Sequence, residues 1–432
     1  MPTIGSGPST SGLFGFETTQ GVLPATPPAD RLPFGNINLN PNVPDFADDA
    51  MDGTSEPREW VAGKFGADGS FSVTGSRESY GPLMKATFGV PVTYGATGWY
   101  DHYFQLGSTM ASSFYFEQDH ADVTEYHLWL GNQISSWRQN CTFQGLFKGE
   151  FGVIGLSMVP YGASQITGTI TDRTGSRALN YITATVKEGG STVAFIKTIN
   201  WNLDLHLERL GSMDGTRYGY AIARSALASL NVDLTAHFLD SSLVTKGING
   251  TETSLEVFAP AVELGHGVKT WLPTGKYKPF GINASGAGTL EQRFNGMFYK
   301  NSSSLVAAEV LTKGFTSVTV TNATDDTLVL AFDGGGDETF DLTTGANTPA
   351  QIAALINATI IGGAAFVEYA DPSNVALGGR VGVRSLVTGP LGSVQVKATS
   401  TCETLLGLHN TVVPGWKAAM LVRVSNAVAS YA

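Results

Sequence analysis

Charged side chains are scarce in this sequence. They make up 15% of the 432 residues, and 26 Lys and Arg residues face 37 Asp and Glu residues, which gives a formal net charge of −11. The low charge density excludes a disordered polyelectrolyte, because disorder of that kind needs high charge and few apolar groups. The acidic balance disfavours tight sequence-independent binding to nucleic-acid phosphates, which needs clustered Lys and Arg.

Cysteine is almost absent, with only Cys141 and Cys402. Two cysteines so far apart do not form a disulfide framework or a CxxC metal site, and their apolar or Thr-rich surroundings predict buried free thiols. No apolar run reaches the roughly 18 residues that a membrane-spanning helix needs. The first residues contain no apolar run led by Lys or Arg, so we expect no signal peptide. We therefore expect a soluble protein that is made in a reducing cytoplasm.

Turn-forming and β-favouring residues are abundant instead. The sequence has 52 Gly, 23 Phe, 14 Tyr and 7 Trp, and 42% of its residues are hydrophobic. This composition is typical of a β-rich protein with many turns. At roughly 100–200 residues per domain, the length predicts two to four domains.

The first 57 residues differ from the rest. They are rich in Pro, Gly, Ser and Asn and have no apolar periodicity, which predicts an extended N-terminal arm over 1–57 rather than a domain. A disordered tail is the alternative, but Phe14, Phe16, Phe34 and Phe46 make the segment too apolar for a purely solvating linker. We expect the arm to lie along a neighbouring subunit.

Two stretches of strand-like sequence follow the arm. The first, 58–190, predicts a β-barrel or sandwich with a short helix over 79–89. The second, 191–312, repeats this order loosely, with a helix over 241–249, and is completed by 416–432. The loose repeat predicts two tandem copies of one mainly-β unit.

One segment of the second unit alternates strictly between apolar and polar residues. Residues 199–210 place Trp201 and Leu203 on one face and polar side chains on the other, which predicts a single strand with one buried face. The polar residues of this strand, together with one from the strand after it, are Asn202, Asp204, His206, Glu208 and Asp233.

Residues 313–415 have a different character and predict a small inserted α+β surface module. A strand pair surrounds Gly334–Gly336, and an amphipathic helix over 348–360 starts at Thr348, a natural N-cap that precedes a proline. The final strand, 417–428, again resembles the barrel strands. We expect the module to leave and re-enter the second barrel through Gly314 and Gly415.

Residues with catalytic or metal-binding chemistry form no familiar motif. The possible metal ligands are His102, His120, His127, Asp101, Asp119, Asp122 and Glu125. Their spacing fits no zinc or di-iron signature, and strand alternation would scatter them over two faces. Residues 334–338 lack the Lys and Ser/Thr of a phosphate loop and predict a hairpin closure. We predict no catalytic, cofactor-binding or metal site, and no enzyme.

The block GSFSVTGSRESYGPLMKATFGVPVTYGATGWYDHYF (69–104) combines a strand pair, a helix ending in Gly89 and an aromatic strand. NWNLDLHLE and ALASLNVDLTAHFLD form a later pair. Over about 60–300 and the final strand, this arrangement resembles the major tail tube protein of long-tailed, non-contractile (siphovirus-like) bacteriophages. The module's ending at Leu405–Leu408 resembles a repeat inserted in flagellins, which implies an outward-facing decoration.

The resemblance implies a structural protein of the phage tail that forms stacked rings around a lumen for DNA. Single-copy family members form hexameric rings, so a two-copy chain is expected to form homotrimeric rings with pseudo-sixfold symmetry. The implied partners are further copies of the chain, the tape measure protein and DNA in the lumen, and the tail terminator and tail-tip proteins, with no membrane and no cofactor. The resemblance carries over no catalytic residues.

Other functions remain open at this point. The abundant Trp, Tyr and Asn would suit a carbohydrate-binding or adhesive tail-tip protein. A β-sandwich glycosidase would need a carboxylate pair about 5–10 Å apart in a cleft. A DNA conduit would instead need a wall that is acidic or neutral, and Asn202, Asp204, His206, Glu208 and Asp233 illustrate such a wall.

Overall fold

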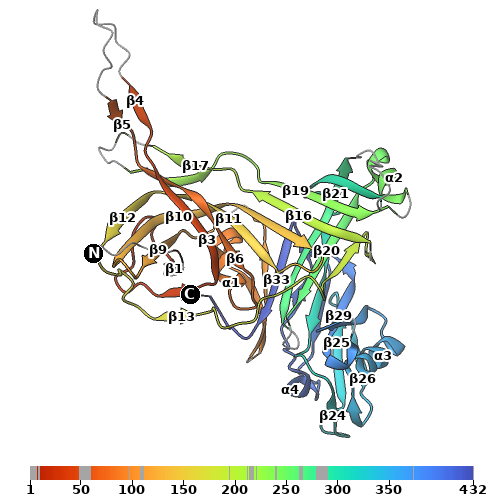
Figure 1. The fold of residues 1–432 in the computed structure, drawn as a ribbon. Coiled ribbons are helices and arrows are strands. Elements are labelled where there is room, and N and C mark those ends of the chain that lie inside the picture. Colours follow the sequence, from red (N-terminus) through yellow and green to blue (C-terminus); the bar gives the residue numbers. More distant parts are fainter. Residues whose placement is uncertain are drawn as a thin grey trace, which may run out of the picture.

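The protein is mainly β, as the sequence predicts, with few helices. The computed structural model describes residues 7, 10–47, 60–96, 98–107, 111–193, 195–211, 213, 218–219, 221–238, 241–261, 266–278, 290–372 and 374–431. Two sheet-rich bodies lie side by side, and a third lies against the second (Figure 1).

The first body contains the N-terminal strands and the helix α1. Its elements are β1 (Thr10–Phe16), β2 (Ala29–Arg31), β3 (Phe34–Asn42), β6 (Gly66–Thr74), α1 (Tyr80–Phe88), β9 (Phe114–His120), β10 (Glu125–Thr142), β11 (Lys148–Gly155), β12 (Ser157–Tyr161) and β13 (Ile170–Asp172). Its strands pair in the order β3, β6, β11, β10, β9, β1. β12 directly follows β11 and pairs with the first half of β10.

The second body repeats this arrangement. Its elements are β14 (Thr185–Glu188), β15 (Ser191–Thr192), β16 (Ile196–Asp204), β19 (Ser229–His237), α2 (Ser242–Asn249), β20 (Thr253–Pro260), β21 (Gly267–Lys278), β22 (Glu291–Phe298) and β33 (Leu421–Asn426). Its strands pair in the order β16, β19, β22, β21, β20, β14. Apart from β13, each of these strands and helices therefore has a counterpart at the same place in chain order and pairing order.

The two bodies also agree in detail. The pairing of β3 with β6 shifts register between Phe34 and Asn36, and the pairing of β16 with β19 shifts at the counterpart positions, Ile196 and Thr198. Just after the shift, both strands read Ile-Asn-x-Asn, at 37–40 and 199–202. The second half of β10 pairs with β16, so the two sheets are continuous, and one hydrophobic core runs through both.

Residues 10–42 belong to the first body, so an arm lying on a neighbouring subunit is wrong for this segment. β1 pairs with β9 along its whole length, and Phe14 is fully buried with its ring centroid 4.7 Å from that of Phe114. Sequence periodicity missed these strands because β1 is buried on both faces and the alternate positions of β3 are asparagines, which have low strand propensity.

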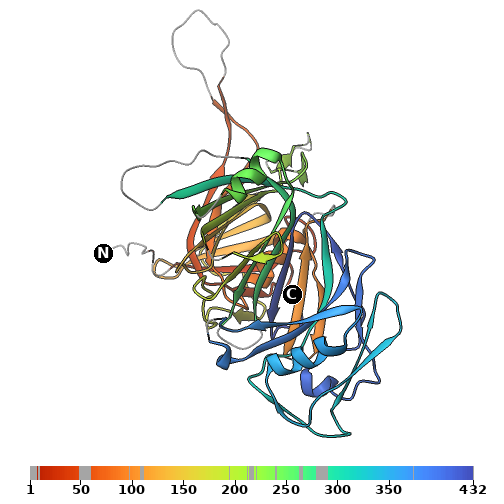
Figure 2. The ribbon, with the colours of Figure 1, turned by 90° about the vertical axis from the view of Figure 1, so that its right-hand side faces the viewer.

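A short hairpin projects from each body at the counterpart place. In the first, β4 (Asp45–Ala47) pairs with β5 (Trp60–Ala62) and extends away from the sheet (Figures 1 and 2). In the second, β17 (Leu207–Leu210) pairs with β18 (Ala221–Arg224). The expected single strand over 199–210 is therefore wrong. It breaks at His206, whose φ of 49° lies in the left-handed region and turns the chain out of the sheet.

The third body is the α+β module. Its elements are β23 (Leu305–Leu311), β24 (Val318–Val320), β25 (Thr327–Phe332), β26 (Asp337–Asp341), β27 (Gly345–Asn347), α3 (Pro349–Thr359), β28 (Gly363–Tyr369), η2 (Val375–Leu377), β29 (Gly379–Thr388), β30 (Ser393–Val396), α4 (Glu403–Leu406), β31 (Val413–Pro414) and β32 (Trp416–Lys417). The module has its own hydrophobic core. As the sequence predicts, α3 begins at an N-cap, and Thr348 and Gln351 form a capping box there.

The module starts earlier than residue 313. β23 pairs with β29 and β32, so it belongs to the module rather than to the second barrel. The apolar sequence of β23 resembles a barrel strand, and only its pairing shows where it belongs. The module therefore occupies the chain between β22 and β33, whereas β11 and β12 are joined in the first body by Leu156 alone.

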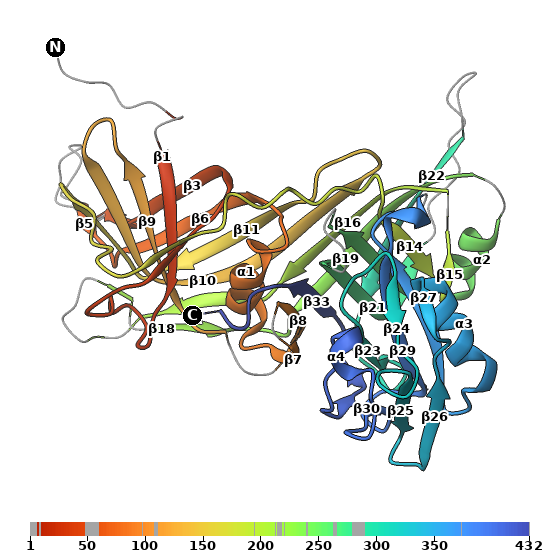
Figure 3. The same cartoon turned by 90° about the horizontal axis from the view of Figure 1, so that it is seen from below.

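A second insertion meets the module. The hairpin of β7 (Val92–Ala96) and β8 (Trp99–Gln105) lies between α1 and β9, a place where the second body passes directly from α2 to β20. β8 pairs with β33, which in turn pairs with β21 (Figure 3). The ring centroids of Tyr103 and Trp416 are 5.4 Å apart. The β7–β8 hairpin inserted in the first body thus packs against the module inserted in the second body.

Candidate functional site

The continuous sheet has one buried face and one polar face. Strand alternation sends Phe71, Phe151 and Trp201 into the core, and sends mostly uncharged polar residues to the other side. The uncharged polar residues of this face include Asn36, Asn38, Asn40, Ser70, Ser72, Thr74, Ser136, Asn140, Thr142, Thr198, Asn200, Asn202, Asn231, Thr235 and Asn295. The face spans both bodies, from β3 to β22.

The few charges on the polar face are mixed in sign and balanced in number. The acidic residues are Asp68, Glu150, Asp204, Asp233 and Glu291, and the basic ones are Lys148, Arg138, Arg293 and, at the end of β21 beside β22, Lys276 and Lys278. Several are paired: Arg138 lies 3.5 Å from Glu150, and the Asn295 amide donates to Asp233 at 2.7 Å. A face of this kind offers a duplex few cations for phosphate contacts.

The sequence-derived wall residues divide between two places. Asn202, Asp204 and Asp233 lie on the polar face. His206 and Glu208 lie beyond the break, in the loop and in β17. The positive φ of His206, which separates them from the face, leaves no periodicity signal in the sequence.

The two ends of the sheet differ. β16 is paired on both edges, with β10 and β19, whereas its counterpart β3 pairs only with β6 among the described strands. An open strand edge presents unpaired backbone N–H and C=O groups and is a ready site for pairing with another chain. This edge lies within residues 1–57, for which composition predicts an arm, although the repeated Ile-Asn-x-Asn is a usable sequence signal for the strand.

A buried cluster of charges fixes the module to the barrels. Arg380 of the module contacts Asp101 of β8 through two nitrogens, at 2.8 and 2.7 Å. Arg423 of β33 bonds to Glu309 and Glu368 of the module. Burial alone would raise the pKa of Asp101, but Arg380 and Arg423 outweigh it and hold that pKa well below its usual range. These carboxylates are structural ion-pair partners, which explains them without a catalytic role.

The possible metal ligands do not come together. His102 is buried, with its ring nitrogens bonded to the Thr93 hydroxyl at 2.8 Å and the Val428 carbonyl at 2.7 Å. His120 and His127 lie at the β9–β10 hairpin, with ring centroids 5.4 Å apart. In the described part of the chain, no three His, Cys, Asp or Glu side chains form a group that could hold a metal ion.

The two thiols and the glycine run have structural roles, as predicted. Cys141 and Cys402 are free and buried, and burial raises the pKa of Cys402 to about 12. Residues 333–336 close the β25–β26 hairpin, with positive φ at Asp333 and Gly334. Both cysteines are therefore packing residues, and the glycine run shapes a hairpin turn.

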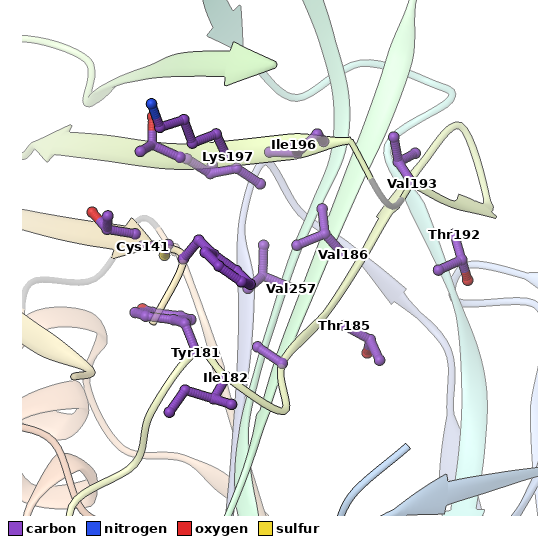
Figure 4. A pocket seen from close by; sticks show the side chains of 15 residues that line it. Cys141, Tyr181, Ile182, Thr185, Val186, Thr192, Val193, Ile196, Lys197 and Val257 are labelled. Atoms are coloured by element: carbon purple, nitrogen blue, oxygen red, sulfur yellow. The ribbon is translucent and has the colours of Figure 1, made fainter. Parts of the chain in front are cut away.

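One apolar hollow lies between the two bodies. Its volume is about 290 Å³, and its lining includes Cys141, Tyr181, Val186, Ile196 and Val257 (Figure 4). Burial raises the pKa of the Cys141 thiol, which keeps it protonated. The hollow offers packing surface rather than reactive groups.

None of the helices in the described ranges is long and apolar enough to span a bilayer.

A continuous sheet with a polar face, an open edge and projecting hairpins defines a mainly-β structural protein. A family model described as phage tail tube protein matches residues 7–266. The chain belongs to the phage tail tube protein family and is a structural component of a bacteriophage virion. The matched region begins before β1, in agreement with the place of β1 in the first body. A search of curated proteins found no match.

Proposed function

We propose that three copies of this chain close into a ring, and that stacked rings form the tail tube of a long-tailed, non-contractile phage through which the genome passes into the host. The observation that carries this proposal is the joint between the two bodies of one chain. There β10 pairs with β16 over seven residue pairs, from Ser136 opposite Asp204 to Thr142 opposite Thr198. The same joint, repeated between chains, would close a ring.

The repeated topology supports a duplicated tube domain. The counterpart strands share their order, pairing, register shift and Ile-Asn-x-Asn sequence. Independent origin of all four features is an unlikely coincidence for two unrelated barrels. Three chains with two such domains each give six domains around the ring, which is pseudo-sixfold symmetry, and a heterologous contact that closes on itself makes a ring.

The open edge of β3 supplies the site for the joint between chains. Since β3 is the counterpart of β16, the strand that would pair with it is β21 of a neighbouring chain, the counterpart of β10. The polar face then continues from chain to chain and lines the lumen. Its mixed charge, with no net basic excess, lets DNA slide, because a basic wall would hold the duplex by many phosphate contacts.

The remaining parts of the chain fit this arrangement. The α+β module is a decoration on the outside of the tube, attached through the ion pairs of β8, β21 and β33. The tape measure protein and then DNA occupy the lumen, and the tail terminator and tail-tip proteins bind the two ends of the tube. No cofactor takes part.

Electron microscopy of the purified protein tests the proposal directly. We expect tubes or rings, and class averages with three copies of the module around each ring. Six chains per ring would overturn the two-domain arrangement, and particles that remain monomers at high concentration would overturn tube formation.

Hydrogen exchange tests the joint itself. In the unassembled chain, amides of β3 should exchange faster than those of β16, because β3 has one unpaired edge. On assembly, protection of β3 should rise by about tenfold or more, while that of β16 stays constant. Equal protection of β3 before and after assembly would show that rings close elsewhere.

A further inference from the structure

We infer that the β4–β5 hairpin is a lateral clasp that binds a second copy of this chain within the same ring, with Trp60 as its anchor. This inference rests on the proposed ring, and it uses the β17–β18 hairpin as an internal template. Both hairpins leave the sheet from counterpart strands, β3 and β16, and return to counterpart strands, β6 and β19.

The template hairpin is seated on the first body of its own chain. Arg209 of β17 donates to both carboxylate oxygens of Asp68, at 2.9 and 2.6 Å, and to the carbonyls of Ala67 and Gly155 at 3.0 and 3.2 Å. Its cross-strand neighbour Ile222 is 5% exposed. The ring centroids of Tyr218 and Phe65 are 5.9 Å apart. The hairpin of the second body therefore reaches back over β6 and β11 of the body before it.

The β4–β5 hairpin has no such seat within the described part of its own chain. Its register matches the template: Asp45 faces Ala62 as Leu207 faces Arg224, and Ala47 faces Trp60 as Arg209 faces Ile222. Trp60 is thus the counterpart of Ile222, but it is 66% exposed. Phe46 and Val61, the next pair, are each 61% exposed. Three exposed large apolar side chains on one short hairpin are typical of an interaction site.

The matching seat is present on the second body. In the template seat, Asp68, which accepts from Arg209, faces Ile154 across β6 and β11. The counterparts of this facing pair are Asn231 and Met297, which face one another across β19 and β22. Met297 is 49% exposed. In this seat Asn231 stands in place of the Asp68 carboxylate that Arg209 binds. The Met297 thioether offers an apolar contact, which suits the indole ring of Trp60. The seat adjoins the proposed joint between chains just as the template seat adjoins the β10–β16 joint.

The β4–β5 hairpin therefore binds the second body of a neighbouring chain, at Asn231 and Met297. A contact between rings would also bury the hairpin, and the two cases differ in how many chains a covalent link joins. Covalent links at lateral contacts would join at most the three chains of one ring, whereas links at contacts between rings would join chains all along the tube.

A double variant, Trp60→Cys with Met297→Cys, treated with a short bis-maleimide after assembly, separates these cases. Cys141 and Cys402 are buried and serve as an internal background. We expect a denaturing gel to show dimers and trimers and no larger product. A ladder beyond three chains, or no link in samples whose tubes are visible by microscopy, would overturn the lateral clasp. Absence of tubes in the wild-type protein would instead contradict the proposed function.

The contribution of Trp60 is measured by assembly. A central, buried Trp contact is often a hot spot, so Trp60→Ala should raise the concentration needed for ring formation by about tenfold or more, while leaving the monomer's circular dichroism and unfolding midpoint unchanged. Leu391→Ala removes a side chain that is 87% exposed on the module and is the matched control. Equal assembly of both variants would overturn the anchor role.

Discussion

The two barrel bodies are built alike but find their partners differently. In the second body, β16 is paired on both edges and the β17–β18 hairpin is seated on its neighbour. In the first, the edge of β3 is open and Trp60 is 66% exposed on the corresponding hairpin. The strand edge and the hairpin that find partners within the chain in the second body are thus left without such partners, among the described residues, in the first body.

The bodies also differ in their insertions. The first passes from β11 to β12 through one residue, while the module interrupts the counterpart connection of the second. The sheet joint between bodies is formed by pairing of mostly uncharged strands, whereas the module is held by buried charges. Sheet pairing of this kind can in principle be repeated by any similar strand edge, whereas a particular cluster of ion pairs fixes one module in one place.

The largest effect is expected at the module, where the bodies differ most. Glu368 bonds to Arg423 and to Lys269, at 3.0 Å for the lysine. Burial would raise the pKa of Glu368, but these cations hold that pKa well below its usual range. Glu368→Gln should lower the free energy of unfolding by about 3–5 kcal/mol in urea titrations, because it leaves buried cations short of a partner. Asp341→Asn, on an exposed strand position, is the control, and similar losses in both would contradict the ion-pair account.

Counterpart core residues provide the next comparison. Trp201 of β16 is 1% exposed and Leu39 of β3 is 8% exposed. In the unassembled chain, Trp201→Ala should cost about 3–5 kcal/mol of unfolding free energy and Leu39→Ala about 2 kcal/mol, because the second site lies in an edge strand. Equal destabilisation of the two variants before assembly would contradict the expected difference between a central strand and an edge strand.

A pH dependence is expected from the start of β21. His266 is buried and stacks on Trp99 with ring centroids 4.7 Å apart, and burial lowers its pKa to about 4. The folded state therefore favours the neutral ring, so stability is highest above pH ~6.5 and falls by about 3 kcal/mol as the pH drops towards 4.

His266→Phe keeps a ring against Trp99 and removes the titration. Unfolding in urea between pH 7 and 4.5 should show a shallower loss of stability in this variant than in the wild type. The counterpart strand β10 begins instead at the exposed Glu125. Parallel pH profiles for wild type and variant would rule out His266 as the source.

The smallest effect on stability is expected on the polar face, where the bodies agree. Asn38→Arg and its counterpart Asn200→Arg should each change the unfolding free energy by no more than about 0.5 kcal/mol. In assembled tubes, however, they should retain duplex DNA in a salt-dependent way. Asn322→Arg, on an exposed loop of the module, is the control. Equal retention by control tubes would show that this face does not line the lumen.

The structural class and many of the elements follow from local sequence. Alternation and aromatic content predicted a mainly-β protein, Gly89 and Thr348 marked the helix ends, and the isolated cysteines predicted free buried thiols, all of which the structure confirms. These features depend on residues close together in the chain, so period and capping rules capture them.

Which strands pair with one another becomes visible only in the folded chain. β1 lies far in sequence from its partner β9, and β23 gives no local sign that its partner is β29 rather than a barrel strand. The break at His206 and the open edge of β3 are likewise invisible to periodicity. Strand pairing is a non-local choice, made by whichever edge can satisfy the backbone and bury the same face, and a single strand's sequence contains only half of that information.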